Sequence, residues 1–402
     1  MRTKVQTVPL VSEVSFLSGG TPRMSDSRFW GGDIPWVSSG EMTESRISLT
    51  ERRVTEEGAQ NGTKRVPANT VLVVVRGMSL AKEFRISITE RDVTFNQDIK
   101  ALRPSERIDP WFLFYYLKSQ RHSIRDSATD ASHGTKKLET RVLEQWPLPL
   151  LDIQTQRSIA SVLSTYDNLI ENNRRRIQLL EQAARLLYKE WFVHIRFPGH
   201  EHVKIVDGVP DGWEKSTVGD STSFLSRGIT PKYDDDAPGL VINQKCIRNR
   251  MVNLELARRQ SKHVPALKFV QFGDVLINST GAGTLGRVAQ FLLENNECTV
   301  DSHITIIRPQ ENVPVHFFGL HITGLEPYIA TLGRGATNQT ELSKDDIAAL
   351  EIVLPTPGLA QIFERTVAPI FHQIRILSEQ IQKLAKSRDF LLPKLMNGEV
   401  TV

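Results

Sequence analysis

The chain has 402 residues, of which 40% are hydrophobic and 24% charged, a composition typical of folded proteins with more than one domain. A net charge of +4 and a pI near 9.0 permit an anionic partner without requiring one. The N-terminus leads into no long apolar run, so we expect a cytoplasmic protein with neither signal peptide nor membrane span. Cys246 and Cys298 are too few for a disulfide framework and lack metal-ligand spacing, which excludes that class of small secreted or zinc-bound fold.

Residues 1–150 are predicted to form a first globular unit that is rich in strands. A β-branched run at residues 71–75 follows a turn at Asn69 and is typical of a buried strand. The aromatic run at residues 111–117 follows Pro110 and predicts a short helix whose rings pack in the core. Base stacking is the alternative role for these rings, and core packing is the commoner one.

Residues 151–193 are predicted to form a long amphipathic helix. Its apolar residues recur at alternating spacings of four and three, the heptad pattern of a coiled coil. From about Thr155 to Trp191 the helix would span roughly 55 Å, which indicates a spacer rather than part of one small core. Asn173 occupies the seam, where a buried asparagine commonly fixes register, although a merely tolerated polar residue is the alternative. The principal seam positions are Ile159, Leu163, Ile170, Asn173, Ile177 and Leu180.

Residues 194–356 are predicted to repeat the plan of the first unit. A glycine-containing turn before Pro231 matches the one before Pro22, and the strand-like run that begins at Val275 lies 204 residues after the one that begins at Val71. A period this long indicates duplicated domains rather than a solenoid.

One segment of this second unit matches a dinucleotide-binding pattern. Gly281, Gly283 and Gly286 have the spacing GxGxxG and follow a predicted strand, which favours a Rossmann site. The next residues, 287–293, form a short strand-like run, and they leave no room for the crossover helix that would hold a pyrophosphate. We therefore interpret the segment as a glycine hairpin or turn.

Residues 357–402 are predicted to form a second long helix that pairs with the first in antiparallel fashion. Pro369 lies inside this segment and predicts either a kink or the start of the helix, while Pro393 and Gly398 mark its end. The fold class expected is α+β, with two strand-rich α/β units joined by two long antiparallel coiled-coil helices. A displacement of 204 places the second seam at Ile370, Ile374, Leu377, Ile381 and Leu384.

At several places the residues resemble type I restriction-modification specificity subunits. Residues 148–192 and 391–399 resemble the two conserved regions of that family. Residues 19–37 and 273–281 resemble parts of its target recognition domains. The match covers nearly the whole chain, and its order and duplication are more specific than any one string. The chain departs from the family pattern mainly at Arg388, which replaces an apolar seam residue.

The resemblance implies a non-catalytic DNA-recognition subunit. In this family each target recognition domain reads one half of a bipartite double-stranded DNA target, and the helices set the gap between the halves. Two methyltransferase subunits dock on the specificity subunit, and restriction subunits, which are also the motor, complete the complex. The family further implies target recognition domains at residues 1–150 and 194–356 and spacer helices at residues 151–193 and 357–402.

Polar and basic loop residues are the candidate DNA contacts, because such groups bind phosphates and base edges. For any single residue a solvated loop position is the commoner explanation, so the segments are the firmer prediction. In the first unit the candidates are Ser38, Ser39, Lys64, Arg65, Arg76, Lys82 and Arg85. In the second unit they are Gln244, Lys245, Arg248, Asn249, Arg250, Thr280, Thr284, Arg287, Arg334, Asn338 and Gln339.

Two other classes of function remain open from the sequence. A coiled-coil adaptor without sequence-specific DNA binding is the main alternative, and a nucleotide-dependent enzyme is the third. No Asn-Pro-Pro-Tyr motif of an amino-methyltransferase and no phosphate loop ending in Gly-Lys-Ser/Thr occurs, so we expect no catalytic residue, cofactor or metal. Salt-sensitive binding to two separated half-sites would distinguish the first function from the others.

Overall fold

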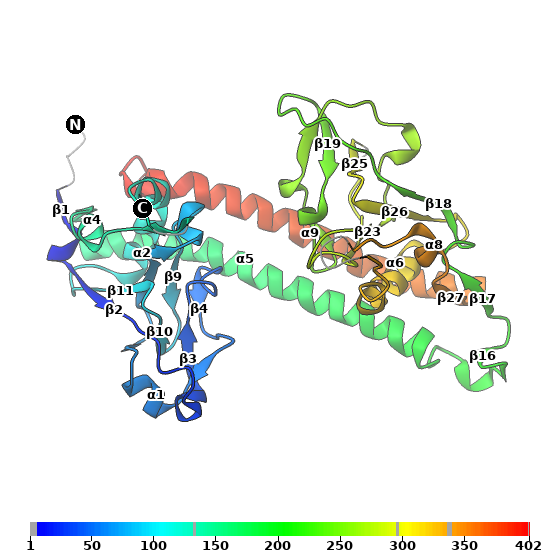
Figure 1. Ribbon diagram of the computed structural model, residues 1–402, viewed down its shortest axis with the longest axis horizontal. Helices are drawn as coiled ribbons and strands as arrows, with labels where there is room; N and C mark the ends of the chain where they lie inside the picture. Colours follow the sequence, from blue (N-terminus) through cyan, green and yellow to red (C-terminus); the bar gives the residue numbers. More distant parts are fainter. Residues whose placement is uncertain (1–5, 132–133, 295–296, 336–339, 401) are drawn as a thin grey trace. The chain divides into compact units, whose positions relative to one another are not determined.

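The chain folds into two compact units, each with a strand-rich body and part of both long helices (Figure 1). Unit 1 comprises Met1–Glu171 and Ile381–Val402, and unit 2 comprises Asn172–Gln380. The predicted α+β class is confirmed. The structure is a computed structural model, and it describes residues 6–131, 134–294, 297–335, 340–400 and 402.

The body of unit 1 is built on a five-stranded sheet in the order β2-β11-β7-β9-β4, in which only β9 and β4 are parallel neighbours. A second sheet has the order β5-β3-β10-β6. Two smaller sheets have the orders β1-β14 and β12-β13-β8. The strands are β1 (Thr7–Pro9), β2 (Val14–Ser18), β3 (Trp30–Val37), β4 (Arg46–Ile47), β5 (Arg53–Val54), β6 (Arg65–Val66), β7 (Val71–Val74), β8 (Arg76–Gly77), β9 (Ile86–Thr89), β10 (Val93–Phe95), β11 (Ile99–Pro104), β12 (Thr129–Asp130), β13 (Lys136–Lys137) and β14 (Pro147–Pro149).

The aromatic run of unit 1 forms the helix α2 (Pro110–Ser119), as predicted. The helix begins there because Asp109 accepts hydrogen bonds from two first-turn amides and proline suits the first turn. Its rings are buried in one core with Ile159 and Leu163 of the first long helix. The other short helices are α1 (Glu56–Gln60), α3 (Arg121–Asp126) and α4 (Thr140–Glu144).

The body of unit 2 has a four-stranded antiparallel sheet in the order β18-β26-β23-β24 and a three-stranded sheet in the order β22-β19-β25. Its short helices are α6 (Val315–Gly324), α7 (Glu326–Ile329) and α8 (Lys344–Ala348). The strands are β15 (Ile205–Val206), β16 (Val209–Pro210), β17 (Glu214–Thr217), β18 (Thr222–Arg227), β19 (Gly239–Ile242), β20 (Ile247–Arg248), β21 (Met251–Val252), β22 (Arg258–Gln260), β23 (Val275–Asn278), β24 (Val288–Gln290), β25 (Cys298–Val300), β26 (Ile304–Pro309) and β27 (Glu351–Leu354).

The two bodies share one topology. The order β2-β11-β7-β9 in unit 1 corresponds to β18-β26-β23-β24 in unit 2, and the parallel pair β3 and β10 corresponds to β19 and β25. Gly19 and Gly228 occupy matching places just after the first long strand. A Cβ at either position would collide with a backbone carbonyl, of Phe95 or of Val300, so the repeated glycine turn follows from close approach of two backbones.

The first long helix, α5 (Ile153–Tyr188), continues into a π-helical turn at Lys189–Val193. The second, α9 (Pro357–Met396), starts 204 residues after the first. Of the two alternatives left open at Pro369, a start of the helix is excluded, because α9 passes through that residue. Pro393 also lies inside the helix, and the left-handed Gly398 follows its end.

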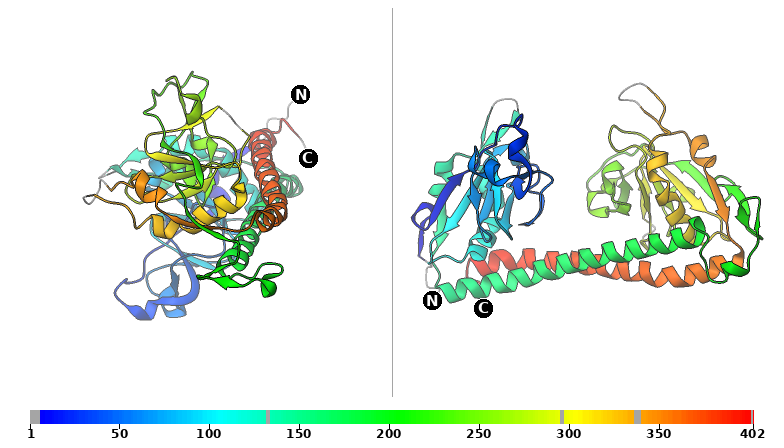
Figure 2. Two further views of the ribbon diagram at one scale, coloured as in Figure 1. Left: turned by 90° about the vertical axis from the view of Figure 1, so that its right-hand side faces the viewer. Right: turned by 90° about the horizontal axis from the view of Figure 1, so that it is seen from below.

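In each unit the two long helices lie side by side in antiparallel fashion (Figure 2). In unit 1, Ile159 and Leu163 share a core with Leu392 and Leu395. In unit 2, Trp191 packs on Phe363 with ring centroids 5.5 Å apart. The predicted seam residues that the structure buries are Ile159, Leu163, Ile170, Asn173, Ile177, Ile374 and Leu377, and those that it half-buries are Leu180, Ile370, Ile381 and Leu384.

Candidate nucleic-acid interface

Four of the predicted DNA-contact residues of unit 1 lie in one region. The Arg85 guanidinium donates to the carbonyl oxygens of Ser39 and Gly40, at 3.1 and 3.3 Å, and Nε bonds to Glu83 at 2.7 Å. Ser38 donates its hydroxyl to Glu41 within the same loop. Lys82 lies beside Arg85 on the rim of a recess of about 340 Å³. The sequence prediction thus identified part of one connected surface.

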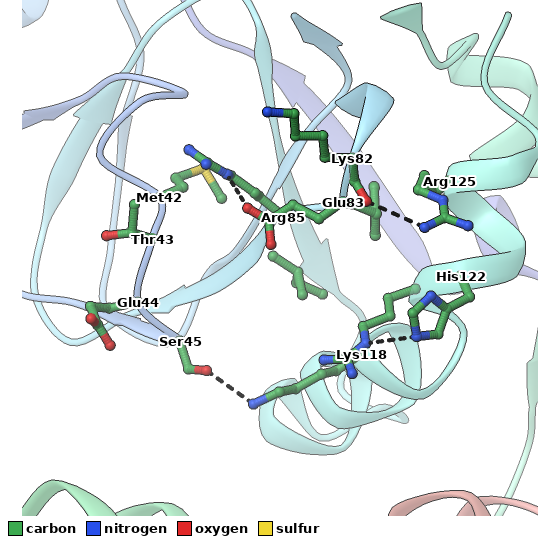
Figure 3. Close-up of a pocket in the computed structure, with 13 residues that line it drawn as sticks. Met42, Thr43, Glu44, Ser45, Lys82, Glu83, Arg85, Lys118, His122 and Arg125 are labelled. Carbon is green, nitrogen blue, oxygen red and sulfur yellow. Dashed lines mark hydrogen bonds and ion pairs between the residues drawn. The ribbon is translucent and has the colours of Figure 1, made fainter. Parts of the chain in front are cut away.

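The opposite wall of this recess comes from α2 and α3, and the sequence analysis missed it. Figure 3 shows Lys118, His122 and Arg125 facing Lys82 and Arg85 across the recess. Together with Arg121 they have spacings of three, four and seven residues from Lys118, which place them on one helical face. This helical periodicity of basic residues, directly after the aromatic run, is the sequence signal that could have predicted the wall. The recess is lined by Met42, Thr43, Glu44, Ser45, Lys82, Glu83, Phe84, Arg85, Ile86, Lys118, Arg121, His122 and Arg125.

Lys118 links the recess to the long helices. Its Nζ donates to the Ser45 hydroxyl at 3.0 Å and lies 3.8 Å from Asp167 of α5. Burial lowers the pKa of Lys118 to about 8, against the opposing effect of Asp167. Its ammonium group therefore has few water molecules around it and is still largely protonated at neutral pH.

A buried ionic cluster lies behind Lys118. Asp167 forms an ion pair with Arg388 of α9 and accepts a hydrogen bond of 2.8 Å from the Tyr115 hydroxyl. Burial alone would raise the pKa of Asp167, but Lys118 and Arg388 outweigh it and hold the pKa below its ordinary value. Arg388 is the residue that replaces an apolar residue of the predicted seam. In the structure it pairs with a carboxylate across the seam.

The other predicted contacts of unit 1 lie elsewhere. Arg65 is on β6, where it forms ion pairs with Glu56 and Asp92, both at 3.0 Å, and the neighbouring Lys64 is exposed. Arg76 is on β8, opposite Lys137 of β13. The candidates of unit 1 therefore fall on three surfaces, not on one.

In unit 2 the structure connects five of the predicted residues. Gln244 donates its side-chain amide to the hydroxyl of Thr280 at 3.1 Å. The hydroxyl of Thr284 donates to the carbonyl of Thr280 at 3.4 Å, and Arg287 closes the same turn by donating to the carbonyl of Gly283. Thr280 and Arg334 each form a backbone bridge with Glu341, which brings the third segment to the group.

The remaining candidates of unit 2 lie outside this hydrogen-bonded group. Lys245 is exposed beside Gln244. Arg248 is exposed on β20, and Asn249 and Arg250 form the tight turn to β21 with positive φ at both residues. Arg250 is also near enough to Glu181 of α5 to lower the pKa of that carboxyl, although burial, the larger effect, leaves it raised. Asn338 and Gln339 lie outside the described residues.

The GxGxxG segment forms the turn between the antiparallel strands β23 and β24. Gly286 has a positive φ, and a Cβ there would collide with Ala330. The glycines therefore serve a hairpin and its packing, and β24 occupies the place where a Rossmann crossover helix would begin.

Neither a metal site nor a membrane span emerges from the described part of the chain. Within it, no group of three or more metal-ligating side chains occurs. None of its helices combines the length and the apolar character needed to cross a membrane.

Comparison with known proteins bears on the family. Residues 11–182 match the family model of the type I restriction modification DNA specificity domain. The type I restriction enzyme MjaIX specificity subunit of Methanocaldococcus jannaschii is 27% identical across 98% of this chain and 93% of its own. The EcoR124I/EcoR124II specificity subunit of Escherichia coli is 30% identical across 38% of each chain. The predicted resemblance to type I restriction-modification specificity subunits is confirmed.

A solved specificity subunit shares the fold. The S subunit of the type-I restriction-modification system from M. genitalium aligns with a TM-score of 0.61, at 16% identity, over 98% of this chain and 96% of that one. The paired sheets and long helices are thus a fold already seen in a specificity subunit.

Proposed function

We propose that this specificity subunit reads a bipartite double-stranded DNA target and positions partner subunits on it. The single observation that carries the proposal is the repeated plan within a chain of this family. Each unit has one strand-rich body with basic and polar loops, joined to an antiparallel pair of long helices. Two readers of separate half-sites need such a duplicated arrangement, with a spacer rigid enough to keep the gap fixed.

The roles follow the division of the sequence. Residues 1–150 and 194–356 act as the two target recognition domains, and residues 151–193 and 357–402 act as the spacer. Methyl transfer to adenine, translocation and cleavage belong to methyltransferase and restriction subunits, of which two methyltransferase subunits dock on this chain. The subunit itself is non-catalytic and needs no cofactor. These roles are supported by the similarity to specificity subunits over nearly the whole chain.

Domain exchange tests the proposal. Replacing residues 1–150 with the first recognition domain of another specificity subunit is expected to change one half of the methylated target and to leave the other half and the gap unchanged. The measurement is genome-wide mapping of methylated adenines in a host that carries the matching methyltransferase subunit.

The matched control replaces residues 194–356 and should change the other half. If either exchange alters both halves, or if methylation is the same with and without this chain, the proposal fails.

A further inference from the structure

The recess between the Ser45 loop and α2–α3 is strongly basic. Five lysine and arginine side chains and one histidine line it, against two glutamates, Glu44 and Glu83. Glu83 is bonded to Arg85 at 2.7 Å. The positive charge in the recess therefore exceeds what its own carboxylates balance.

The cations of the recess differ in how they are held. Arg85 is fixed by carbonyl oxygens of the loop at Ser39 and Gly40, and Arg125 is fixed by Asp126 at 2.7 Å and by the carbonyl of Lys82. Within the described part of the chain, neither Lys82 nor Arg121 forms an ion pair. Arg121 bonds to the ring of His122 at 3.4 Å. An anion entering the recess would meet the held guanidinium groups and these two cations, neither of which is neutralised by a carboxylate.

Lys118 closes the inner end of the recess. Its side chain is 9% exposed, and its Nζ bonds to Ser45 while Asp167 lies 3.8 Å away on the side of the helices. An ammonium group in so dry a place gains more from a further anion than an exposed one does, because less water screens the attraction.

The corresponding place in the second unit carries different residues. There the helix α7 (Glu326–Ile329) carries no lysine or arginine, and Glu326 accepts a hydrogen bond from the amide of Val288. Gly286 packs against Ala330 just after this helix. The basic residues that line the recess of unit 1 are therefore not required by the shared fold.

We propose that this recess is a phosphate-binding site of the first recognition domain and that its occupant is a phosphodiester group of the DNA backbone. This assignment rests on the proposed function. Backbone phosphates are bound by lysine, arginine and hydroxyl groups, the groups this recess presents, and such contacts fix the position of a protein on DNA without reading its sequence. A free phosphate ion has the same chemistry and is the other source to be tested.

The first test measures phosphate binding by the full chain in the absence of DNA. The variant Lys82→Gln/Arg121→Gln removes the two exposed cations that form no ion pair, so it should fold. The control, Arg103→Gln/Arg141→Gln, removes two exposed arginines of the same unit from outside the recess. Added inorganic phosphate, at constant ionic strength, is expected to raise the melting temperature of wild type and control and to leave that of the recess variant unchanged. An equal response of all three proteins, or none in wild type, overturns the site.

The second test distinguishes the source of the phosphate. The affinity of the full chain for a DNA duplex is measured over a range of salt concentration. Affinity for DNA falls as the salt concentration rises, so the slope of log affinity against log salt is negative. Loss of one phosphate contact is expected to make this slope shallower by about 1 in the recess variant. A lost phosphate response with an unchanged slope overturns the DNA assignment and leaves a site for free phosphate. Wild-type chain that binds phosphate but no DNA at any salt refutes both that assignment and the proposed function.

Discussion

The two units carry different residues at equivalent positions of their long helices. Asp167 and Arg388 form a buried ion pair in unit 1, with Tyr115 and Lys118 around them. A displacement of 204 takes Asp167 to Phe371 and Arg388 to Ala184. In unit 2 both of these residues belong to an apolar cluster.

The same helix pair therefore tolerates two different seams. A buried ion pair seldom adds net stability over well-packed apolar residues, because both charges lose their hydration. The two residues of such a pair instead depend on each other, because burying either charge without its partner lowers the free energy of unfolding. Unit 2 has apolar residues at these two positions, so the shared fold does not require an ion pair between them. In unit 1, substitution of either Asp167 or Arg388 alone should lower the stability.

The largest effect is expected for Arg388→Leu. This change removes the ion-pair partner of the buried Asp167, which keeps the Tyr115 hydroxyl at 2.8 Å and Lys118 at 3.8 Å, and the free energy of unfolding should fall by about 3 kcal/mol. The measurement is urea unfolding of the full chain. Arg375→Leu on the same helix is the control. It breaks an ion pair of 3.6 Å with Glu379 that is more exposed, which should cost about 0.5 kcal/mol.

A double variant tests whether the two charges depend on each other. Adding Asp167→Asn to Arg388→Leu should cost less than the sum of the two single losses, because either single change already breaks their ion pair. Equal losses for Arg388→Leu and Arg375→Leu, or a double loss equal to the sum of the single losses, would show that the pair is not coupled.

Acid should affect the two seams differently, because the pKa of Asp167 is below its ordinary value of 3.8 in the folded chain. The stabilisation it provides is complete above the unfolded pKa and is lost as pH falls through the folded pKa. The free energy of unfolding of wild type should therefore exceed that of Asp167→Asn by the largest amount above about pH 5. This difference in stability should become smaller below pH 4. Urea unfolding at a series of pH values measures it. Asp389→Asn, at a more exposed carboxyl, serves as the control; a difference that is constant with pH refutes the linkage.

The smallest effect on stability is expected at Asn173. Its amide donates to Gln380 at 3.3 Å, and its repeat equivalent is the buried Leu377. Asn173→Leu should leave stability equal or raise it by about 1 kcal/mol, because Gln380 is exposed and can bond to water instead. If Asn173 fixes the register of the seam, the variant should also discriminate less between the cognate DNA gap and gaps one base pair longer or shorter.

The reverse exchange, Leu377→Asn, provides the control for this position. It places an amide at a fully buried site, and we expect a clear loss of stability. If Asn173→Leu loses stability and keeps its discrimination between gaps, Asn173 is a hydrogen-bonded structural residue and not the determinant of register.

The repeat, the two long helices and the kinds of element in each body could be predicted from the sequence. Heptad spacing and β-branched runs act over a few residues, so they can be read without knowing the fold. The displacement of 204 held from the start of α5 to the start of α9. At Pro369 the sequence left a kink or a helix start open, and the structure excludes the start, because α9 continues through this residue despite the local cost of proline.

Which polar residues share a surface could not be predicted, because it depends on the packing of distant segments. Ser39 and Arg85 are far apart in sequence and touch, whereas Arg65 and Arg76 lie on two other sheets. The partner of Arg388 was equally hidden, since Asp167 lies on the other helix, 221 residues away. The physical reason is that charges interact through space, and the distances between segments are set by the packing of the whole unit rather than by spacing along the chain.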